Sequence, residues 1–229
     1  MWSVFYYFLF FMMNTIITPF TDSSRELVDC YIAVFGEAPW NEWYISEISW
    51  VLYPLSTVDF GDDEVRPYYD PQELNVLWQS WSSKQWFTGQ LAQVLQWDEV
   101  QTIWFIAGWK TTLSQLNDEK LWIGSDIWAL SDAISRQFPW FDEQKLRYAA
   151  DLWVLSDYRD QWVARELYDA RQSAMIQQWA QRTIVRTIKW LAKPYQWYID
   201  RCGFVPVYDY NDEQNRTILV AKLPTNEDY

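Results

Sequence analysis

The chain begins with a long apolar run that stops at a proline and a polar segment. Residues 2–20 contain no charged side chain, and Pro19 lies near their end. Nineteen residues in a helix rise about 28 Å, which is close to the thickness of the hydrocarbon core of a bilayer. We therefore predict a transmembrane or membrane-anchor helix over residues 1–21. The aromatic side chains expected to anchor it are Trp2, Phe5, Phe8 and Phe11.

Two alternatives compete with a membrane helix for this run. A cleaved signal peptide is disfavoured, because no basic residue precedes the apolar stretch and no small-residue cleavage site follows it. A helix buried in a protein core stays open, since Asn14 and Thr15 are polar and aromatic residues are numerous. The orientation of a membrane helix is undetermined, because Arg25 is the one basic residue close to the run.

Helical periodicity and helix start signals recur through residues 22–203. Asp70 is a typical N-cap residue, Pro71 suits the first turn, and Glu73 interacts favourably with the helix dipole. Gly36 is a plausible end for the helix that begins near Ser23. Further helix starts are expected at Ser82, Asp98, Asp118 and Asp142.

Tryptophan recurs in this helical region with a period near 25 residues. Trp78, Trp104, Trp128 and Trp153 are separated by 26, 24 and 25 positions, and the last two share a Trp-x-Leu-Ser-Asp motif. A period of this length fits one helix and its connection in a helical-repeat array. Ordinary amphipathic helices in a tryptophan-rich chain give the same pattern, so both interpretations stay open.

The last part of the chain changes from helical to strand-like patterning. The longest helical pattern covers residues 142–193, with a break near Ser156, and Pro194 ends it. Two β-prone runs in residues 204–229 then surround a polar turn, which predicts a hairpin with an acidic tail. The predicted fold is therefore mainly α: a transmembrane helix, a tryptophan-rich helical bundle or helical-repeat array over residues 22–203, and a short C-terminal β-hairpin.

The composition excludes several classes of chemistry. The absence of His removes His general bases, His-activated nucleophiles and His metal ligands. The two Cys residues, Cys30 and Cys202, are too few for a four-thiolate site, and we expect two free thiols rather than a disulfide. The 6 Gly among 229 residues fall below the usual level of about 7%, and no phosphate-binding glycine motif occurs. We assign no catalytic residue, cofactor-binding residue or metal ligand.

The charge pattern points to one basic surface on an acidic protein. The net charge of −13 disfavours nucleic acid as a partner. Four basic residues step by three or four positions and fall on one face of the expected helix, with two tryptophans at its border. These residues are Arg182, Arg186, Lys189, Lys193, Trp179 and Trp190. An anionic lipid surface or a protein partner fits such a face, and a surface helix that pairs with this chain's own acids is the alternative.

Carboxylates offer weaker candidates for chemistry. The acidic segment over residues 59–64 does not match the EF-hand spacing, so a solvated loop is favoured over a calcium site. Asp157, Asp160 and Glu166 could act as an acid and base in a glycosidase. The separation of such a pair is a spatial property that the sequence does not give.

The predicted function follows from the absence of motifs and the 18 Trp residues, which exceed what one core needs. We expect a non-catalytic accessory subunit of a larger membrane complex, single-pass, in the inner membrane of mitochondria or bacteria. Its partners would be protein subunits of that complex, with anionic lipid as a further contact. The first alternative is a helical-repeat protein that binds a peptide or protein. The second is a carboxylate-based hydrolase that acts on glycans.

Overall fold

The fold is mixed α/β and is built around a seven-stranded sheet. The computed structural model describes residues 15–21, 25–36, 44–46, 52–53, 65–96, 99–159, 162–189, 192–213 and 215–224. The strands of the large sheet follow the order β1-β5-β6-β7-β8-β10-β9, and a second sheet has the order β3-β2-β4. The prediction of a mainly helical bundle or repeat array is therefore wrong.

The chain forms two compact units. The first comprises Met1–Ser83, Gly89–Ile106 and Asp151–Ala170, and the second comprises Lys84–Thr88, Ala107–Ala150 and Arg171–Tyr229. Two long strands, β6 (Glu99–Lys110) and β7 (Leu146–Val154), contribute residues to both units.

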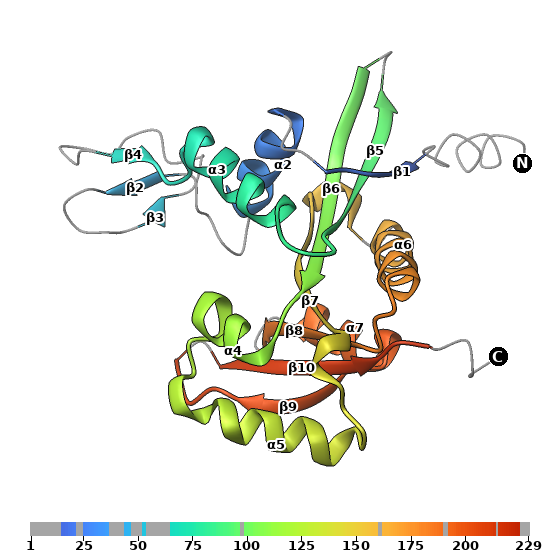
Figure 1. Cartoon of the computed structure of the whole chain (residues 1–229). Helices are drawn as coiled ribbons and strands as arrows, with labels where there is room; N and C mark the ends of the chain where they lie inside the picture. Colours follow the sequence, from blue (N-terminus) through green and yellow to red (C-terminus); the bar gives the residue numbers. More distant parts are fainter. Residues whose placement is uncertain are drawn as a thin grey trace, which may run out of the picture. The chain divides into compact units, whose positions relative to one another are not determined.

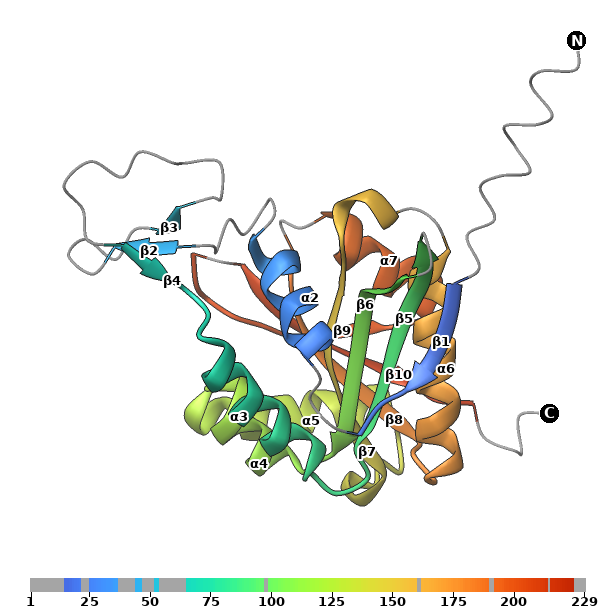
Figure 2. The same ribbon diagram turned by 90° about the horizontal axis from the view of Figure 1, so that it is seen from above.

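The start of the described chain is a strand, not a membrane helix. Strand β1 (Thr15–Pro19) lies beside β5 (Thr88–Gln96) (Figure 2) and pairs with it antiparallel. In this pairing Thr15 lies opposite Val94. Most of its five residues are β-branched, and such side chains favour a pleated strand over a helix. The helix predicted over residues 1–21 is wrong where the structure describes it, and the predicted anchor residues Trp2, Phe5, Phe8 and Phe11 lie outside the described residues. Among the residues that are described, no helix has the length and apolar character needed to cross a membrane.

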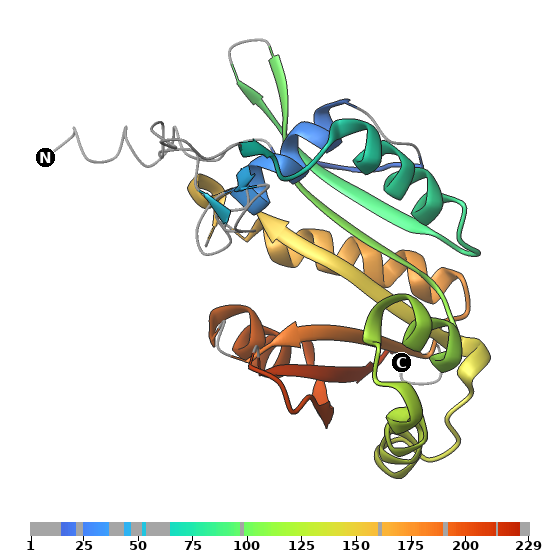
Figure 3. The ribbon, with the colours of Figure 1, turned by 90° about the vertical axis from the view of Figure 1, so that its left-hand side faces the viewer.

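Two helices cover the β5–β6 part of the first unit. Helix α2 (Arg25–Gly36) lies beside α3 (Pro71–Ser82), as Figure 3 shows. The Asp70 side chain accepts a hydrogen bond from the Gln72 amide at 2.7 Å, and Pro71 is the first helical residue, so the predicted helix start at Asp70 is confirmed.

Aromatic rings join these helices to the sheet. Tyr31 of α2 stacks on Phe105 of β6 with ring centroids 5.6 Å apart. Trp78 of α3 meets Phe105 edge to face at 5.1 Å and Tyr31 at 6.0 Å. Such pairs add to the burial of large apolar surface, so this cluster anchors α2 and α3 on the sheet. The small sheet of this unit contains β2 (Tyr44–Ser46), β3 (Leu52–Tyr53) and β4 (Val65–Pro67).

The second unit contains the C-terminal strands. Strand β10 (Arg216–Lys222) pairs antiparallel with β8 (Arg182–Ile188) and with β9 (Val205–Asp209), so the two β-prone runs of the sequence do pair. Figure 1 shows α5 (Ile127–Gln137) lying along β9. The other helical elements are α4 (Leu113–Leu116), the π-helical turn Asn117–Leu121, the 3₁₀ turns Gly124–Asp126 and Glu143–Lys145, and α7 (Ala192–Cys202).

The long helix predicted over residues 142–193 is instead a strand, a helix and a strand. Strand β7 is followed by the 3₁₀ turn Ser156–Tyr158, helix α6 (Val163–Gln177) and strand β8. Strands β7 and β8 are parallel, with Leu146 opposite Arg182 and Tyr148 opposite Ile184. A parallel pair of strands needs a crossover connection, and α6 provides it. Apolar runs buried on both faces of a sheet resemble buried helices in sequence, which explains the error.

The tryptophan repeat does not correspond to a structural repeat. Trp78 lies in helix α3, Trp104 in strand β6, Trp128 in helix α5 and Trp153 in strand β7. Equal spacing therefore places these residues in two kinds of element, and the array of helical repeats is wrong.

Tyr210 should titrate well above an ordinary tyrosine. Burial raises its pKa to about 12, and its hydroxyl donates a hydrogen bond to the Leu121 carbonyl at 2.9 Å. Since the folded pKa exceeds the unfolded value of about 10, the stabilisation by this group is complete below pH ~10 and is lost as the pH rises towards 12. The phenolate absorbance of the protein minus that of Tyr210→Phe should show one titration near pH 12. A difference curve centred near pH ~10 would contradict this environment.

Candidate functional site

The connection from β7 to α6 is the candidate site in the first unit. Hydrogen bonds to its own residues and to β6 hold its backbone in place. The Tyr158 amide donates to the Leu155 carbonyl at 3.0 Å, and the Leu155 amide donates to the Ile103 carbonyl of β6 at 3.4 Å. The Tyr158 hydroxyl donates to the Gln101 side chain at 3.3 Å. These bonds fix the 3₁₀ turn against β6.

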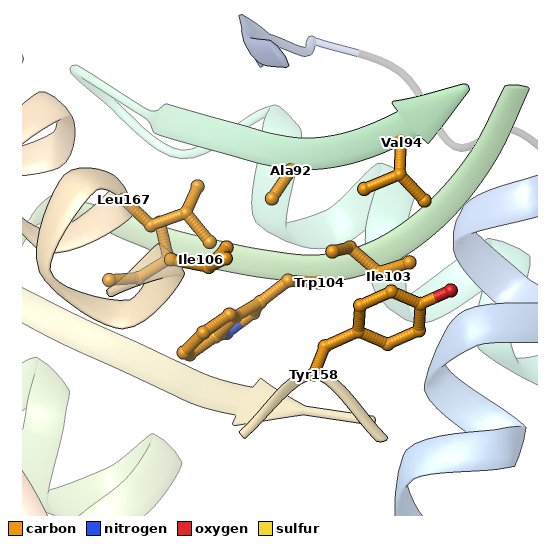
Figure 4. Close-up of a cluster of buried hydrophobic side chains, with 8 residues drawn as sticks. Ala92, Val94, Ile103, Trp104, Ile106, Tyr158 and Leu167 are labelled. Carbon is orange, nitrogen blue, oxygen red and sulfur yellow. The ribbon is translucent and has the colours of Figure 1, made fainter. Parts of the chain in front are cut away.

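A compact apolar cluster holds both ends of this connection. Figure 4 shows side chains from β5, β6 and α6 gathered with Tyr158. The buried members are Ala92, Val94, Ile103, Trp104, Ile106, Tyr158, Val163 and Leu167. Val163 is the first residue of α6, so the start of the helix is fixed as firmly as the turn that precedes it.

The start of α6 carries exposed side chains of both charges, with Arg159 and Arg165 on the basic side and Asp157 and Glu166 on the acidic side. Trp162 directly precedes the helix with a φ of 65°, and its side chain is 80% exposed. Its carbonyl accepts bonds from the amides of Arg165 at 2.9 Å and Glu166 at 3.2 Å. Arg159 and Arg165 are both exposed, and Arg165 pairs with Asp169 at 2.8 Å. A helix N-terminus with nearby arginines attracts anions, phosphate groups in particular.

Two buried arginines donate hydrogen bonds to backbone carbonyls within the second unit. Arg147 of β7 donates to the carbonyls of Leu146 at 2.9 Å and Gln178 at 2.7 Å, and burial lowers its pKa. Arg171 of α6 is fully buried and donates to the Ala107 carbonyl at 3.4 Å. A Cβ on Gly108 would lie 2.7 Å from the Tyr148 carbonyl, so glycine allows β6 and β7 to approach closely there.

The four basic residues predicted to share a helix face do not lie on one helix. Arg182 and Arg186 belong to strand β8, Lys189 follows it, and Lys193 belongs to α7. The Arg182 guanidinium lies over the Phe138 ring at 4.9 Å, that of Arg186 over Trp122 at 5.0 Å, and Lys189 pairs with Asp209 at 2.7 Å.

Three of these four basic residues therefore contact aromatic or acidic side chains of the protein itself. Of the two tryptophans predicted at its border, Trp179 is exposed at the end of α6 and Trp190 lies outside the described residues. A contact of these residues with lipid or with a protein partner stays a prediction.

The other sequence candidates are dispersed. Asp157 is exposed in the 3₁₀ turn of the β7–α6 connection, and Glu166 is exposed in the first turn of α6. Asp160 and the acidic segment over residues 59–64 lie outside the described residues. No disulfide joins Cys30 and Cys202.

Comparison with known proteins shows which fold this is. No protein-family model matches the sequence, and no curated protein matches it. Among solved structures, an acetyltransferase of the GNAT family from Staphylococcus aureus Mu50 is 10% identical, with a TM-score of 0.52 over 92% of this chain and 100% of that chain. The ribosomal-protein-S18-alanine N-acetyltransferase from Escherichia coli is 8% identical, with a TM-score of 0.51 over 92% and 95%. A chain of the NatC complex bound to Gag peptide and CoA is 12% identical, with a TM-score of 0.53 over 93% and 100%.

The chain has the GNAT fold. This finding overturns the prediction of a non-catalytic accessory subunit of a membrane complex, because two of the structures with this fold are acetyltransferases by name. It also removes the alternatives of a helical-repeat binding protein and a glycan hydrolase. The expected single-pass location in an inner membrane is also wrong, and no described helix is long and apolar enough to cross a membrane.

The β7–α6 connection was missed for a physical reason. Phosphate-binding loops are recognised in sequence by glycine motifs, and the residue before α6 is Trp162. The signal that could have found it is a strand followed by a helix start with Arg159 nearby. The sequence pattern of β7 resembles that of a helix, so the strand-to-helix boundary does not stand out.

Proposed function

We propose that this protein is an acyl-CoA-dependent N-acetyltransferase. The observation that carries the proposal is the GNAT fold, which covers more than nine tenths of the chain in each comparison above. One of those structures contains CoA by its title, and two are N-acetyltransferases or acetyltransferases by name.

The start of α6 is the place we assign to the phosphates of the acyl donor. The helix is 15 residues long, so its dipole is well developed. The amides of Arg165 and Glu166 bond to the Trp162 carbonyl. The amides of Val163 and Ala164 belong to the first turn, where a helix offers no backbone acceptor of its own, and we assign the phosphate to them. Arg159 is exposed and precedes the helix by four positions in the sequence, so we assign its positive charge to the same phosphates.

The reaction needs no metal ligand, nucleophilic side chain or His base. The nitrogen of a neutral amine attacks the thioester carbonyl, a C–N bond forms, and the C–S bond breaks. The proton lost by the amine ends on the CoA sulfur or in water. The residue types that the composition excludes are therefore not required, and their absence is compatible with this activity.

The acceptor class follows from charge. A net charge of −13 draws cations to the protein surface, and primary amines are cations at neutral pH. We expect peptide N-termini, lysine side chains or polyamines to be acetylated in preference to anionic amines.

Acetyl transfer can be measured as amine-dependent release of the CoA thiol, with the mass of the acceptor as a second readout. The proposal expects thiol release that depends on both protein and amine, together with an acceptor heavier by one acetyl group. Failure of a panel of peptides, lysine and polyamines to show transfer, with no binding of acetyl-CoA, would overturn it.

Arg159→Glu should weaken acetyl-CoA binding without unfolding the protein. Because Arg159 is exposed, the change places a negative charge beside the helix start instead of a positive one. Loss of a charge-assisted contact and added repulsion should lower affinity by about tenfold or more. The matched control is Arg136→Glu, an exposed residue that pairs with Asp132 at 2.9 Å in α5. Equal affinities of the two variants in a calorimetric titration would contradict this assignment.

A further inference from the structure

Six described residues other than glycine have a left-handed backbone, and five of them are tryptophan. They are Trp86, Trp122, Trp140, Trp162, Trp179 and Asn215, with φ between 51° and 65°. Left-handed backbone costs a residue with a side chain about 1–2 kcal/mol, and glycine alone adopts it freely. Asn is the usual exception, whereas a bulky aromatic residue is an outlier.

These tryptophans occupy backbone positions that glycine usually fills. Trp179 follows α6, its amide bonds to Ile176 at 2.9 Å, and the next amide, of Ala180, bonds to Met175 at 3.0 Å. This pair of bonds defines the Schellman motif, in which the left-handed residue is usually glycine. Gly203 has the same role directly after α7, with a φ of 69°.

Two of the others occupy turn positions that glycine favours. Trp140 follows Pro139, and proline followed by a residue of positive φ is typical of a type II turn. Trp86 is the third residue of a turn that the Phe87 amide closes on the Lys84 carbonyl at 3.2 Å.

Exposure separates the five left-handed tryptophans from the buried ones, while Trp128 of α5 is exposed with an ordinary backbone. The five with positive φ are 38–95% exposed. Trp78, Trp81, Trp104 and Trp109 have ordinary backbone angles and are 1–4% exposed. Only the buried tryptophans pack as tryptophan normally does in a core.

The composition agrees with this division. The chain holds 18 Trp and 6 Gly, so tryptophan is in excess where glycine is short of its usual level of about 7%. Separate mutations of glycine codons would give Ala, Ser, Arg, Glu or Val as readily as Trp. Five positions that all carry Trp point to one cause.

We propose that the cell that makes this protein inserts glycine at positions 86, 122, 140, 162 and 179, through one codon that is written as tryptophan in this sequence. UGA is a codon of this kind, because genetic codes differ in whether it means stop, tryptophan or glycine. Glycine at position 162 would also remove an exposed indole from the start of α6. The inference does not depend on the proposed activity.

Mass spectrometry of the protein from its source cells decides the proposal. Trypsin releases residues 172–182, which contain Trp179 as their one tryptophan, and residues 160–165, which contain Trp162. Both peptides should carry glycine there. Residues 85–110 provide an internal control, because position 86 should be glycine while Trp104 and Trp109 remain. Tryptophan at positions 162 and 179 would overturn the proposal.

A stability measurement tests its physical premise in recombinant protein. Trp140→Gly and Trp179→Gly should each raise the thermal midpoint by roughly 2–4 °C, because glycine relieves the left-handed backbone. Trp128→Gly is the matched control: it is 78% exposed but lies in the first turn of α5 with an ordinary helical backbone, so glycine relieves no strain and should not raise the midpoint. A lower midpoint for Trp140→Gly and Trp179→Gly would overturn the inference.

Discussion

Acetyl-CoA at about 100 times its dissociation constant is expected to raise the thermal midpoint of this protein by roughly 5–10 °C. A ligand that binds the folded state alone at that concentration stabilises it by about 2.7 kcal/mol. The expectation rests on the GNAT fold and on the exposed start of α6 with Arg159 beside it. Scanning calorimetry with and without the ligand measures the shift directly.

The controls separate recognition of CoA from recognition of an acetyl group. Free CoA should stabilise the protein nearly as much as acetyl-CoA, because its phosphates are the groups that we assign to the helix start. Acetyl phosphate should give little shift. No shift with either CoA compound, at concentrations that stabilise another acetyltransferase, would contradict the assignment.

Trp104→Ala should cost about 3–5 kcal/mol of the free energy of unfolding. Trp104 is 2% exposed and lies in the apolar cluster that holds the β7–α6 connection. Its removal leaves a cavity that the surrounding strands and α6 can fill only in part. Since stabilities of about 5–15 kcal/mol are usual, this loss is a large fraction of the total. Urea unfolding followed by circular dichroism measures it.

Two variants test whether burial is the cause. Trp104→Phe keeps most of the apolar volume and removes an indole N–H that has no hydrogen-bond partner among the described residues, so it should cost much less. Trp162→Ala removes an indole that is 80% exposed and keeps the same backbone strain, so it should change stability little. Similar losses for Trp104→Ala and Trp162→Ala would contradict the packing described for Trp104.

Local signals in the sequence were reliable where short-range bonds decide the structure. Asp70 caps α3 as predicted, and α2 ends at Gly36 as expected. Asp142 also accepts a bond from the Gln144 amide at 3.0 Å, yet the element it caps is a 3₁₀ turn that leads into a strand. A cap therefore marks a turn in the backbone, while the type of element after that turn depends on packing with distant residues.

Elements that depend on distant residues could not be predicted. Residues 102–109 of β6 and 146–150 of β7 are buried at every position, so these stretches show neither helical nor strand periodicity. The parallel pairing of Leu146 with Arg182 joins residues far apart in sequence through a crossover helix. No window of the sequence contains that information, and the candidate site depends on it.

The candidate site is hard to recognise in the sequence because of the residue type at position 162, as well as because of the topology. A positive φ at position 162 favours glycine, and the tryptophan there removes the usual sequence sign of a phosphate-binding turn. The basic residues that did stand out, such as Arg182 and Arg186, are engaged with Phe138 and Trp122. Charge spacing on an assumed helix was misleading because that segment is a strand.

Hydrogen exchange with and without acetyl-CoA is the most direct test of the account, because it locates the donor site without assuming an acceptor. We expect slower exchange in the connection from β7 to α6, over residues 151–166, and no comparable change in α5. Protection that is absent from this connection at a saturating concentration of acetyl-CoA would contradict the claim that the start of α6 binds the acyl donor.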